Sequence, residues 1–275
     1  MLELTNISFA YAGNKTMAVR DVSLHIPAGE FTAVAGRNGS GKTTLTKLIM
    51  SLLKPSSGSI KFRGQDTKKL TSADMAHCIG YVFQNPDRQI FRDTVAEEVA
   101  YGPRQLEFSP DRIRAAVEKA LAVTGLEEVA KAYPKTLTKG LKQKVAIASA
   151  LAMEPKVLIL DEPTSGQDVQ SGLALMELLT ELNVQGCSII LVTHNMELLA
   201  RYASRAIIMH QGEKAFDGPV GELFGQSRDI GCWGLREPAT TLISRNLQKY
   251  GAELTDDPLI LAQNMCRLLG GKAHA

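Results

Sequence analysis

A glycine-rich segment near the start of the chain has the residue types and spacing that bind phosphate. Residues 36–43 fit the pattern G-x-x-x-x-G-K-[ST]. In such a loop successive backbone N–H groups converge on phosphate oxygens, because glycines leave the approach open. Lys42 is expected to reach the β- and γ-phosphates of a nucleotide, and the Thr43 hydroxyl to bind Mg²⁺. The candidate nucleotide-binding residues of this loop are Gly36, Arg37, Asn38, Gly39, Ser40, Gly41, Lys42, Thr43 and Thr44.

A strand and a helix are expected to hold the loop between them. Residues 31–35 form an apolar run that predicts a buried strand. Residues 42–53 carry apolar side chains at helical spacing, and Pro55 lies just beyond the expected end. The free N–H groups and the dipole at the start of that helix favour phosphate. A chance glycine-rich turn is the competing interpretation, and these flanks argue against it.

A second apolar run, residues 157–160, ends in the adjacent carboxylates of Asp161 and Glu162. We expect this run to be a strand of the same parallel sheet, which brings both carboxylates to the carboxyl edge where ligands bind. Asp161 is the candidate Mg²⁺ partner, and Glu162 can polarise the attacking water. On its own an Asp-Glu pair indicates a solvated turn. The buried strand before it and residues 163–168 after it favour the catalytic interpretation.

A third predicted strand, residues 188–192, is followed by Thr193 and His194. Most histidines at strand ends are hydrogen-bonded surface residues. Because this strand is expected to neighbour the phosphate loop, His194 is also a candidate contact of the γ-phosphate. The spacing alone does not decide between the two interpretations.

These motifs occur in the order seen in ABC-type ATPases, and the chain resembles that family over about residues 1–220. The order is the phosphate loop, Gln84 after an apolar strand, the pair Asp161 and Glu162, residues 165–168, and His194. The resemblance implies an α/β fold of the P-loop NTPase type. It implies a parallel core sheet, a small antiparallel β subdomain and an inserted helical subdomain. ATP and Mg²⁺ are the implied cofactors, and ATP hydrolysis is the implied reaction.

The resemblance also implies a role for each matching residue. Tyr11 matches the aromatic residue that stacks on adenine, and Gln84 the Q-loop residue that senses Mg²⁺ and the transmembrane partner. Asp161 and Glu162 match the Walker B pair, and His194 the switch histidine. The implied catalytic residues are Glu162 and His194. The implied Mg²⁺ ligands are Thr43, Gln84 and Asp161. The matching D-loop consists of Ser165, Gly166, Gln167 and Asp168.

The family signature Leu-Ser-Gly-Gly-Gln falls on a segment that departs from it. The matching residues are Leu137, Thr138, Lys139, Gly140 and Leu141. In the family this loop begins a helix and closes over the γ-phosphate bound by the opposing subunit. Lys139 replaces a glycine where the backbone should approach phosphate, and Leu141 lacks the amide of Gln. Because a homodimer would pair every good phosphate loop with a poor signature, we predict a heterodimer with a second ATPase subunit.

A finer resemblance lies in residues 84–91 and 94–103, between the Q-loop and the signature. These segments are similar to the ATPase component of energy-coupling-factor (ECF) transporters, and so is the tail at residues 234–238. The resemblance implies import of vitamins or metal ions. It implies as partners a transmembrane coupling subunit and a substrate-binding membrane subunit, which selects the solute. Residues 84–91 are expected to contact the coupling subunit, with Asp87 and Arg88 available to pair with opposite charges there.

Composition and charge agree with this interpretation. The 275 residues are 44% hydrophobic and 22% charged, as in ordinary globular proteins, and the net charge of +2 gives no sign of attraction to nucleic acid. The four cysteines lack metal-binding spacing and fit a reducing cytosol. No apolar run approaches the roughly 18–20 residues that cross a bilayer, and the first residues lack a signal-peptide pattern. We therefore expect a peripheral protein on the cytoplasmic face of the membrane, held there by membrane subunits.

Two parts are expected along the chain. Residues 1–220 form the ATPase domain, with the helical subdomain at about residues 86–152. Within that subdomain a helix is predicted to begin after Ser109 and to end at Gly125. Residues 221–275 form a C-terminal helical extension.

The extension is predicted to contain an amphipathic helix after Pro258. Its apolar face carries Leu261, Met265, Leu268 and Leu269, and the pair at residues 270–271 is expected to end it. This face either covers the protein's own core or contacts a second subunit, and the pattern supports both interpretations equally.

Three alternatives to an ECF-type ATPase remain open. In the first, the chain is the ATPase of another ABC transporter class, which the shared motifs fit as well. A non-transport ABC protein acting on nucleic acid or ribosomes typically has two ATPase halves or long coiled-coil insertions, and neither is present in the sequence. A non-hydrolysing ATP-sensing subunit is suggested by the altered signature, while Glu162 and His194 argue against it.

Overall fold

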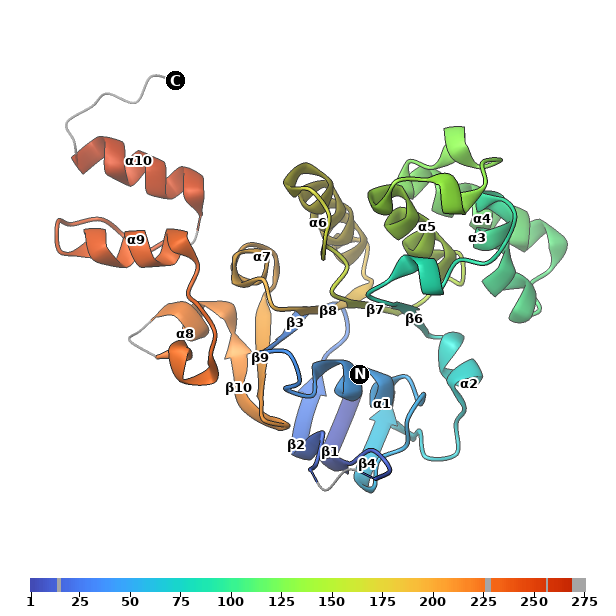
Figure 1. Ribbon diagram of the computed structural model, residues 1–275, viewed down its shortest axis with the longest axis horizontal. Helices are drawn as coiled ribbons and strands as arrows, with labels where there is room; N and C mark the ends of the chain where they lie inside the picture. The colour runs from blue at the N-terminus through green and yellow to red at the C-terminus, as the bar shows by residue number, and fades with distance from the viewer. Residues whose placement is uncertain (14–15, 226–228, 256, 269–275) are drawn as a thin grey trace.

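The computed structural model describes residues 1–13, 16–225, 229–255 and 257–268. Two sheets form the framework (Figure 1). The larger sheet has the order β10 (Glu213–Pro219), β9 (Arg205–His210), β3 (Phe31–Ala35), β8 (Ser188–Thr193), β7 (Val157–Asp161) and β6 (Ile79–Val82). The smaller sheet is antiparallel, with the order β2 (Val19–Ile26), β1 (Leu2–Phe9), β4 (Ser57–Phe62) and β5 (Gln65–Asp66). The predicted core sheet and antiparallel subdomain are therefore confirmed.

Parallel pairing brings the three functional loops to one edge of the larger sheet. β8 lies between β3 and β7 and is parallel to both, with Ala35 opposite Thr193 and Asp161 opposite Val192. The chain leaves these strands at the same edge because their carboxyl ends are in register. The phosphate loop follows β3, Glu162 follows β7 and His194 follows β8.

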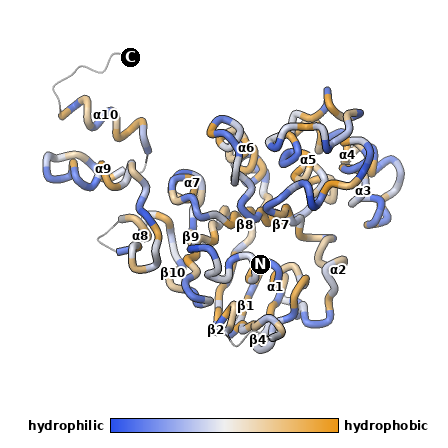
Figure 2. Tube along the Cα trace, viewed as in Figure 1, coloured by the Kyte–Doolittle hydropathy of each residue, from blue (hydrophilic) through white to orange (hydrophobic). Residues whose placement is uncertain are grey.

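Each face of the larger sheet has its own apolar core, since side chains of a strand alternate between faces. In β8, Ile189 and Leu191 pack toward α6 (Val169–Val184) and α7 (Met196–Tyr202). Ile190 and Val192 pack toward α1 (Lys42–Ile49) and the antiparallel sheet. Figure 2 shows the resulting concentration of apolar residues along the central strands.

The helical segment between β6 and β7 has a separate apolar core. It is built by α3 (Val95–Gln105), α4 (Pro110–Thr124) and α5 (Lys139–Leu151), whose buried residues form one cluster. The Ser109 hydroxyl caps α4 by accepting from the N–H of Arg112, and Gly125 ends α4 with a left-handed backbone, φ 65. The predicted start and stop of this helix are confirmed.

The remaining elements are short or belong to the C-terminal part. They are α2 (Ser72–Ala76), α8 (Val220–Gly225), α9 (Ala239–Gln248), α10 (Pro258–Leu268) and four 3₁₀ turns, η1 (Pro86–Arg88), η2 (Glu127–Val129), η3 (Pro134–Thr136) and η4 (Ile230–Trp233). In Figure 1, α9 and α10 lie at the opposite end of the molecule from α3, α4 and α5.

One helix prediction was wrong in detail. The helix α1 ends at Ile49 and not near residue 53, because Ser51 takes a left-handed backbone, φ 57, and the N–H of Leu52 turns back to the carbonyl of Lys47. The predicted helix after Pro258 is present as α10, with Leu261 buried and Met265 39% exposed, so the described residues cover its apolar face only in part. Leu269 and the predicted end of this helix at residues 270–271 lie outside the described residues.

Within the described part of the chain, none of the helices combines the length and the apolar character needed to cross a membrane.

Candidate nucleotide-binding site

The phosphate loop folds back around the side chain of Lys42. The Lys42 ammonium donates hydrogen bonds to the carbonyls of Gly36 (2.8 Å) and Arg37 (2.9 Å). Gly36 has φ 148, and a Cβ there would collide with the backbone carbonyl of Met209. Gly41 has φ 103 at the start of α1, where a Cβ would collide with the carbonyl of Ala18. Both positions therefore require glycine for reasons of close backbone approach.

Buried charges give this loop its electrostatic character. Burial lowers the pKa of Lys42 from its ordinary value, and the nearby carboxylates of Glu162 and Asp161 act in the opposite direction. Burial raises the pKa of Asp161, and a hydrogen bond from the Thr43 hydroxyl (3.2 Å) partly offsets that shift. A bound divalent cation and phosphate would lie beside these partly desolvated groups. The attraction of Asp161 for the cation and of Lys42 for the phosphate would therefore be stronger than in water.

Glu162 lies where three separate loops meet. Its carboxylate accepts a hydrogen bond from the Gln84 amide (Nε2 to Oε2, 2.9 Å) and contacts Nδ1 of His194 (3.1 Å from Oε1). The side chain is only 12% exposed. Its backbone has φ 47, a left-handed conformation uncommon for a residue with a side chain, and its N–H donates to the carbonyl of Val192 (2.9 Å). The structure thus brings Gln84, Glu162 and His194 together, as the sequence suggested.

A cavity of about 390 Å³ collects most of the predicted nucleotide contacts. Tyr11 closes one side, with its hydroxyl 3.1 Å from the Thr44 hydroxyl. Ala18 also lines this cavity, and sequence reasoning missed it because an alanine carries no chemical signal. Arg37 and His194 line a second, adjoining cavity instead. The predicted residues that line the first cavity are Tyr11, Asn38, Gly39, Gly41, Lys42, Thr43, Thr44, Gln84 and Glu162.

The residues present fit MgATP. The buried Ser40 hydroxyl has no hydrogen-bond partner among the described residues, as expected of a group that hydrogen-bonds a phosphate oxygen when nucleotide is bound. Thr43 and Asp161 offer a hydroxyl and a carboxylate side by side, and Gln84 offers an amide oxygen nearby. Oxygen donors of this kind, completed by phosphates and water, are what Mg²⁺ prefers.

The signature and the D-loop lie together, apart from the phosphate loop. Thr138 caps α5 by accepting from the N–H of Leu141 (3.4 Å), and the ammonium of Lys139 occupies the space that a Cβ at Gly166 would need. Thr138, Gly140 and Leu141 share a cavity of about 280 Å³ with Gln167 and with residues of α6. Within the described chain the Thr138 hydroxyl is thus used to cap α5, and the Lys139 ammonium lies against the D-loop.

The segment after Gln84 differs from expectation at one residue. Asp87 was expected to be available for a partner's charge, but its carboxylate is bound by the ammonium of Lys142 in α5 (2.7 Å). The reason is geometric: the turn η1 packs against α5, which places Lys142 beside it. Neither residue type indicates this pairing, because the two are far apart in the sequence.

An aromatic and basic surface follows this turn. Phe91 is 54% exposed, and the Arg92 guanidinium lies over the rings of Phe91 (5.1 Å) and Tyr101 (4.4 Å). The buried carboxylate of Glu98 accepts from the N–H groups of Phe91 (2.9 Å) and Arg92 (2.8 Å), which holds the loop in place. Sequence reasoning did not single out Glu98 for this role.

Comparison with known proteins decides the family. A family model described as ABC transporter matches residues 19–165, more than half of the chain. The chain belongs to the ABC transporter family. The predicted ABC-type ATPase family and the predicted fold are therefore confirmed.

Individual relatives extend the comparison. An energy-coupling factor transporter ATP-binding protein EcfA1 from Clostridium perfringens is 37% identical over 265 residues, which cover 94% of each chain. The solved structure of cbiO1 from Clostridium perfringens, part of the ABC transporter complex cbiONQ, is 34% identical with a TM-score of 0.76 and covers 84% of this chain and 94% of that one. The dimeric ATP-binding cassette MJ0796, bound to ADP and Pi after hydrolysis, is 31% identical with a TM-score of 0.72 over 80% and 99% of the two chains.

Other relatives are much longer than this ABC cassette. Putative ABC transporter ATP-binding proteins from Methanosarcina mazei, Caldanaerobacter subterraneus and Methanosarcina acetivorans are 39–40% identical to it. The chain spans only 39–44% of the length of these proteins.

Proposed function

We propose that this chain binds MgATP, hydrolyses it and thereby energises a membrane importer of the ECF type. The observation that carries the proposal is the placement of Glu162 between Gln84 and His194, at the cavity that also holds Lys42 and Thr43. A carboxylate held this way can accept a proton from an attacking water. The EcfA1 relative and the cbiO1 structure support the transporter type.

Each residue of the cavity has a proposed task. Tyr11 stacks on the adenine, and Lys42 binds the β- and γ-phosphates. Thr43, Gln84 and Asp161 hold Mg²⁺, which neutralises charge on the phosphates. Glu162 orients water and takes its proton. His194, which already contacts Glu162, binds the γ-phosphate from the neighbouring loop.

The second ATPase subunit completes the site. The MJ0796 cassette is dimeric when bound to ADP and Pi, which supports a dimer here. In the proposed dimer one subunit's signature faces the other's phosphate loop, as the resemblance to ABC-type ATPases implies. Because Lys139 and Leu141 depart from the signature, this chain offers its partner a poorer contact than it receives. We therefore favour a heterodimer with unequal sites over a homodimer.

The membrane partner would dock beside the Q-loop. Phe83 (39% exposed) and Phe91 offer an apolar surface there, and Arg92 adds a positive charge. This surface fits a helix of a transmembrane coupling subunit that carries apolar and acidic side chains. The cassette would then lie peripherally on the cytoplasmic face. In this proposal residues 1–220 are the ATPase domain, residues 221–275 are a separate helical extension, and nucleic acid is no partner.

The proposed cargo is a vitamin or a metal ion, selected by a separate substrate-binding membrane subunit. Identification of the chains that co-purify with the full-length, tagged protein from native membranes tests the proposal. We expect a second ATPase subunit and two membrane subunits. Recovery of components of another ABC transporter class would contradict the ECF type, and recovery of ribosomal or nucleic-acid partners alone would contradict transport.

A further inference from the structure

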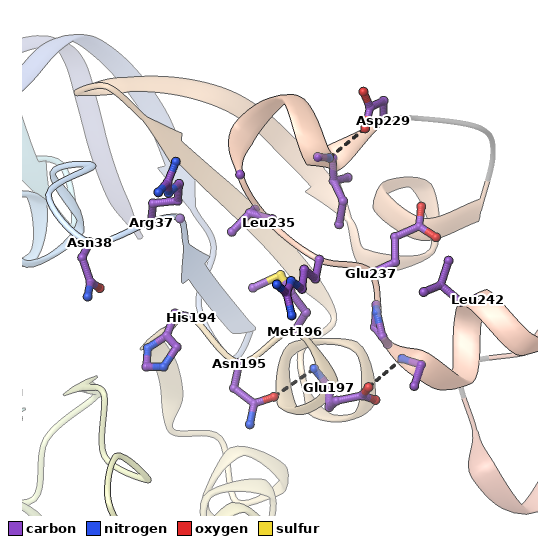
Figure 3. A pocket seen from close by; sticks show the side chains of 17 residues that line it. Arg37, Asn38, His194, Asn195, Met196, Glu197, Asp229, Leu235, Glu237 and Leu242 are labelled. Atoms are coloured by element: carbon purple, nitrogen blue, oxygen red, sulfur yellow. Dashed lines mark hydrogen bonds between the residues drawn. The ribbon is translucent and has the colours of Figure 1, made fainter.

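A cavity of about 910 Å³ lies beside the nucleotide site, between the phosphate loop, the switch loop (residues 194–195, which join β8 to α7) and the C-terminal extension (Figure 3). Arg37 and Asn38 line it from the phosphate loop, and His194 from the switch loop. Residues 229–239 and Leu242 line it from the extension, with the exception of residues 232–233. The extension therefore adjoins two of the loops that contact nucleotide in the proposed function.

A hydrogen bond joins the extension to the start of α7, directly after the switch loop. The carboxylate of Glu197 accepts from the backbone N–H of Ala239, the first residue of α9, at 2.7 Å. This N–H is one of the four at a helix start that lack a partner within the helix. Asn195 in turn caps α7 by accepting from the N–H groups of Glu197 (3.0 Å) and Leu198 (3.2 Å). His194 directly precedes this cap, so the tie lies three residues from the switch histidine.

Packing holds the extension against both loops. Met196 of α7 (6% exposed) belongs to the same apolar cluster as Ile230 and Leu235 of the extension. Gly234 has φ 67 and lies against the side chain of Arg37, which occupies the space that a Cβ would need. A movement of the extension would therefore displace groups on both sides of the nucleotide site.

We propose that Glu197 is a positioning residue, which uses the N–H of Ala239 to hold the switch loop and with it His194. The inference rests on the proposed function. While the tie is intact, the start of α7 is fixed from both sides and the contact of His194 with Glu162 is maintained. Because coupling between sites is reciprocal, nucleotide that binds His194 also biases the position of α9. The C-terminal extension is thus mechanically linked to hydrolysis.

Four variants isolate this hydrogen bond. Glu197→Ala removes the acceptor, while Glu197→Gln keeps an acceptor oxygen of similar shape. Ala239→Pro removes the donor at the first helical position, where proline is well tolerated. Ala239→Gly is its matched control because it keeps the N–H. The double variant Glu197→Ala with Ala239→Pro shows whether both single changes act through one contact.

The first measurement is steady-state hydrolysis by the complete assembly. We expect Glu197→Ala and Ala239→Pro each to lower kcat about fivefold and to change KM for ATP less than about twofold, because a positioning loss acts on the reaction more than on binding. The matched controls should keep at least about half of kcat, and the double variant should be no slower than either single one. Equal losses in the controls, or multiplying losses in the double variant, would overturn the proposal.

The second measurement does not depend on hydrolysis. Trp233 is the only tryptophan of the chain and packs at the edge of the cluster that joins the extension to α7. Its fluorescence should shift when MgATP is added to the wild-type chain, and this response should be lost in Glu197→Ala and Ala239→Pro but kept in Glu197→Gln and Ala239→Gly. A wild-type response without hydrolysis would contradict the proposed function alone. The absence of any wild-type response, or an unchanged response in all four variants, would overturn the coupling itself.

Discussion

Glu162 and Asp161 are adjacent in the sequence, yet the structure gives them different environments. Asp161 ends β7 and is buried against Thr43, whereas the left-handed backbone of Glu162, φ 47, turns its carboxylate toward Gln84 and His194. Such a backbone costs about 1–3 kcal/mol and persists only when the surroundings impose it. In the proposed function, this difference separates a metal-binding carboxylate from a catalytic one in two adjacent residues.

We expect the ionised Asp161 carboxylate to lower the free energy of unfolding, although the proposed function requires it to bind Mg²⁺. Burial raises its pKa, so the folded chain holds this proton more tightly than the unfolded chain. The free energy of unfolding therefore falls as the pH rises from the ordinary aspartate value of 3.8 through the raised one. We predict that Asp161→Asn raises the melting temperature by about 2–4 °C at pH 8 and abolishes Mg²⁺-dependent hydrolysis.

Calorimetry of nucleotide-free protein from pH 8 down to about pH 4 checks this prediction, since the thermal gain should shrink as the pH falls toward the ordinary aspartate value of 3.8. The exposed Asp93→Asn variant is the control, and its melting temperature should follow that of the wild type. A destabilised Asp161→Asn variant would show that the carboxylate stabilises the fold, against the direction argued here.

Lys42 should contribute to nucleotide affinity directly. Its ammonium is held by the carbonyls of Gly36 and Arg37, at the centre of the phosphate loop. We predict that Lys42→Ala raises the Kd for ATP at least about tenfold, because one buried charge–phosphate contact is lost. Titration calorimetry measures this, with Lys47→Ala on the same helix as a control. Equal Kd values for Lys42→Ala and wild type would contradict the role of Lys42.

At the scale of elements, one ion pair joins the Q-loop to the signature helix. Lys142 of α5 binds Asp87 in the turn η1, and their side chains are 16% and 55% exposed. We predict that Lys142→Met changes the free energy of unfolding by less than about 1 kcal/mol, since the exposed Asp87 carboxylate lets solvent screen the pair. The same variant should increase amide hydrogen exchange in residues 84–91. Exchange there that matches a Lys135→Met control would show that the pair does not restrain the Q-loop.

The elements also show which parts of the fold could be predicted and which could not. The apolar strands and the phosphate loop were predictable because their signals are local: buried runs of four to six residues and glycines at fixed spacing. The end of α1 was not predictable, because the turn at Ser51 depends on backbone hydrogen bonds that the residues after it donate to the carbonyl of Lys47. In α10, Asn264 is buried because its amide donates to the carbonyl of Glu253, a tertiary contact that the apolar pattern does not contain.

The candidate site divides in the same way. The residue types of Asp161, Glu162 and His194 indicated their chemistry, and strand order explained why they converge. The Glu197 tie and the pairing of Asp87 with Lys142 could not be predicted, because each joins segments far apart in the sequence through groups that are common on protein surfaces.

At the scale of the whole molecule, the altered signature predicts unequal sites in the assembled dimer. Restoring Lys139→Gly together with Leu141→Gln should speed hydrolysis at the partner's phosphate loop. Adding Lys42→Ala to this chain silences its own site, so the remaining rate reports the partner's site alone. We expect that rate to rise severalfold on restoration. A native assembly that contains two copies of this chain with two equal, fast sites would contradict the prediction.

Hydrolysis of ATP through Glu162 can be tested by comparing two assemblies. The rate of ATP hydrolysis at saturating MgATP is measured for the co-purified assembly with wild-type Glu162 and with Glu162→Gln. In both assemblies the partner ATPase subunit carries a variant that cannot hydrolyse. We predict that Glu162→Gln lowers the rate of hydrolysis at least about a hundredfold, because the amide cannot accept the proton of the attacking water. The affinity for ATP should be retained, because the amide is nearly isosteric with the carboxylate. Equal rates for the two assemblies would contradict it.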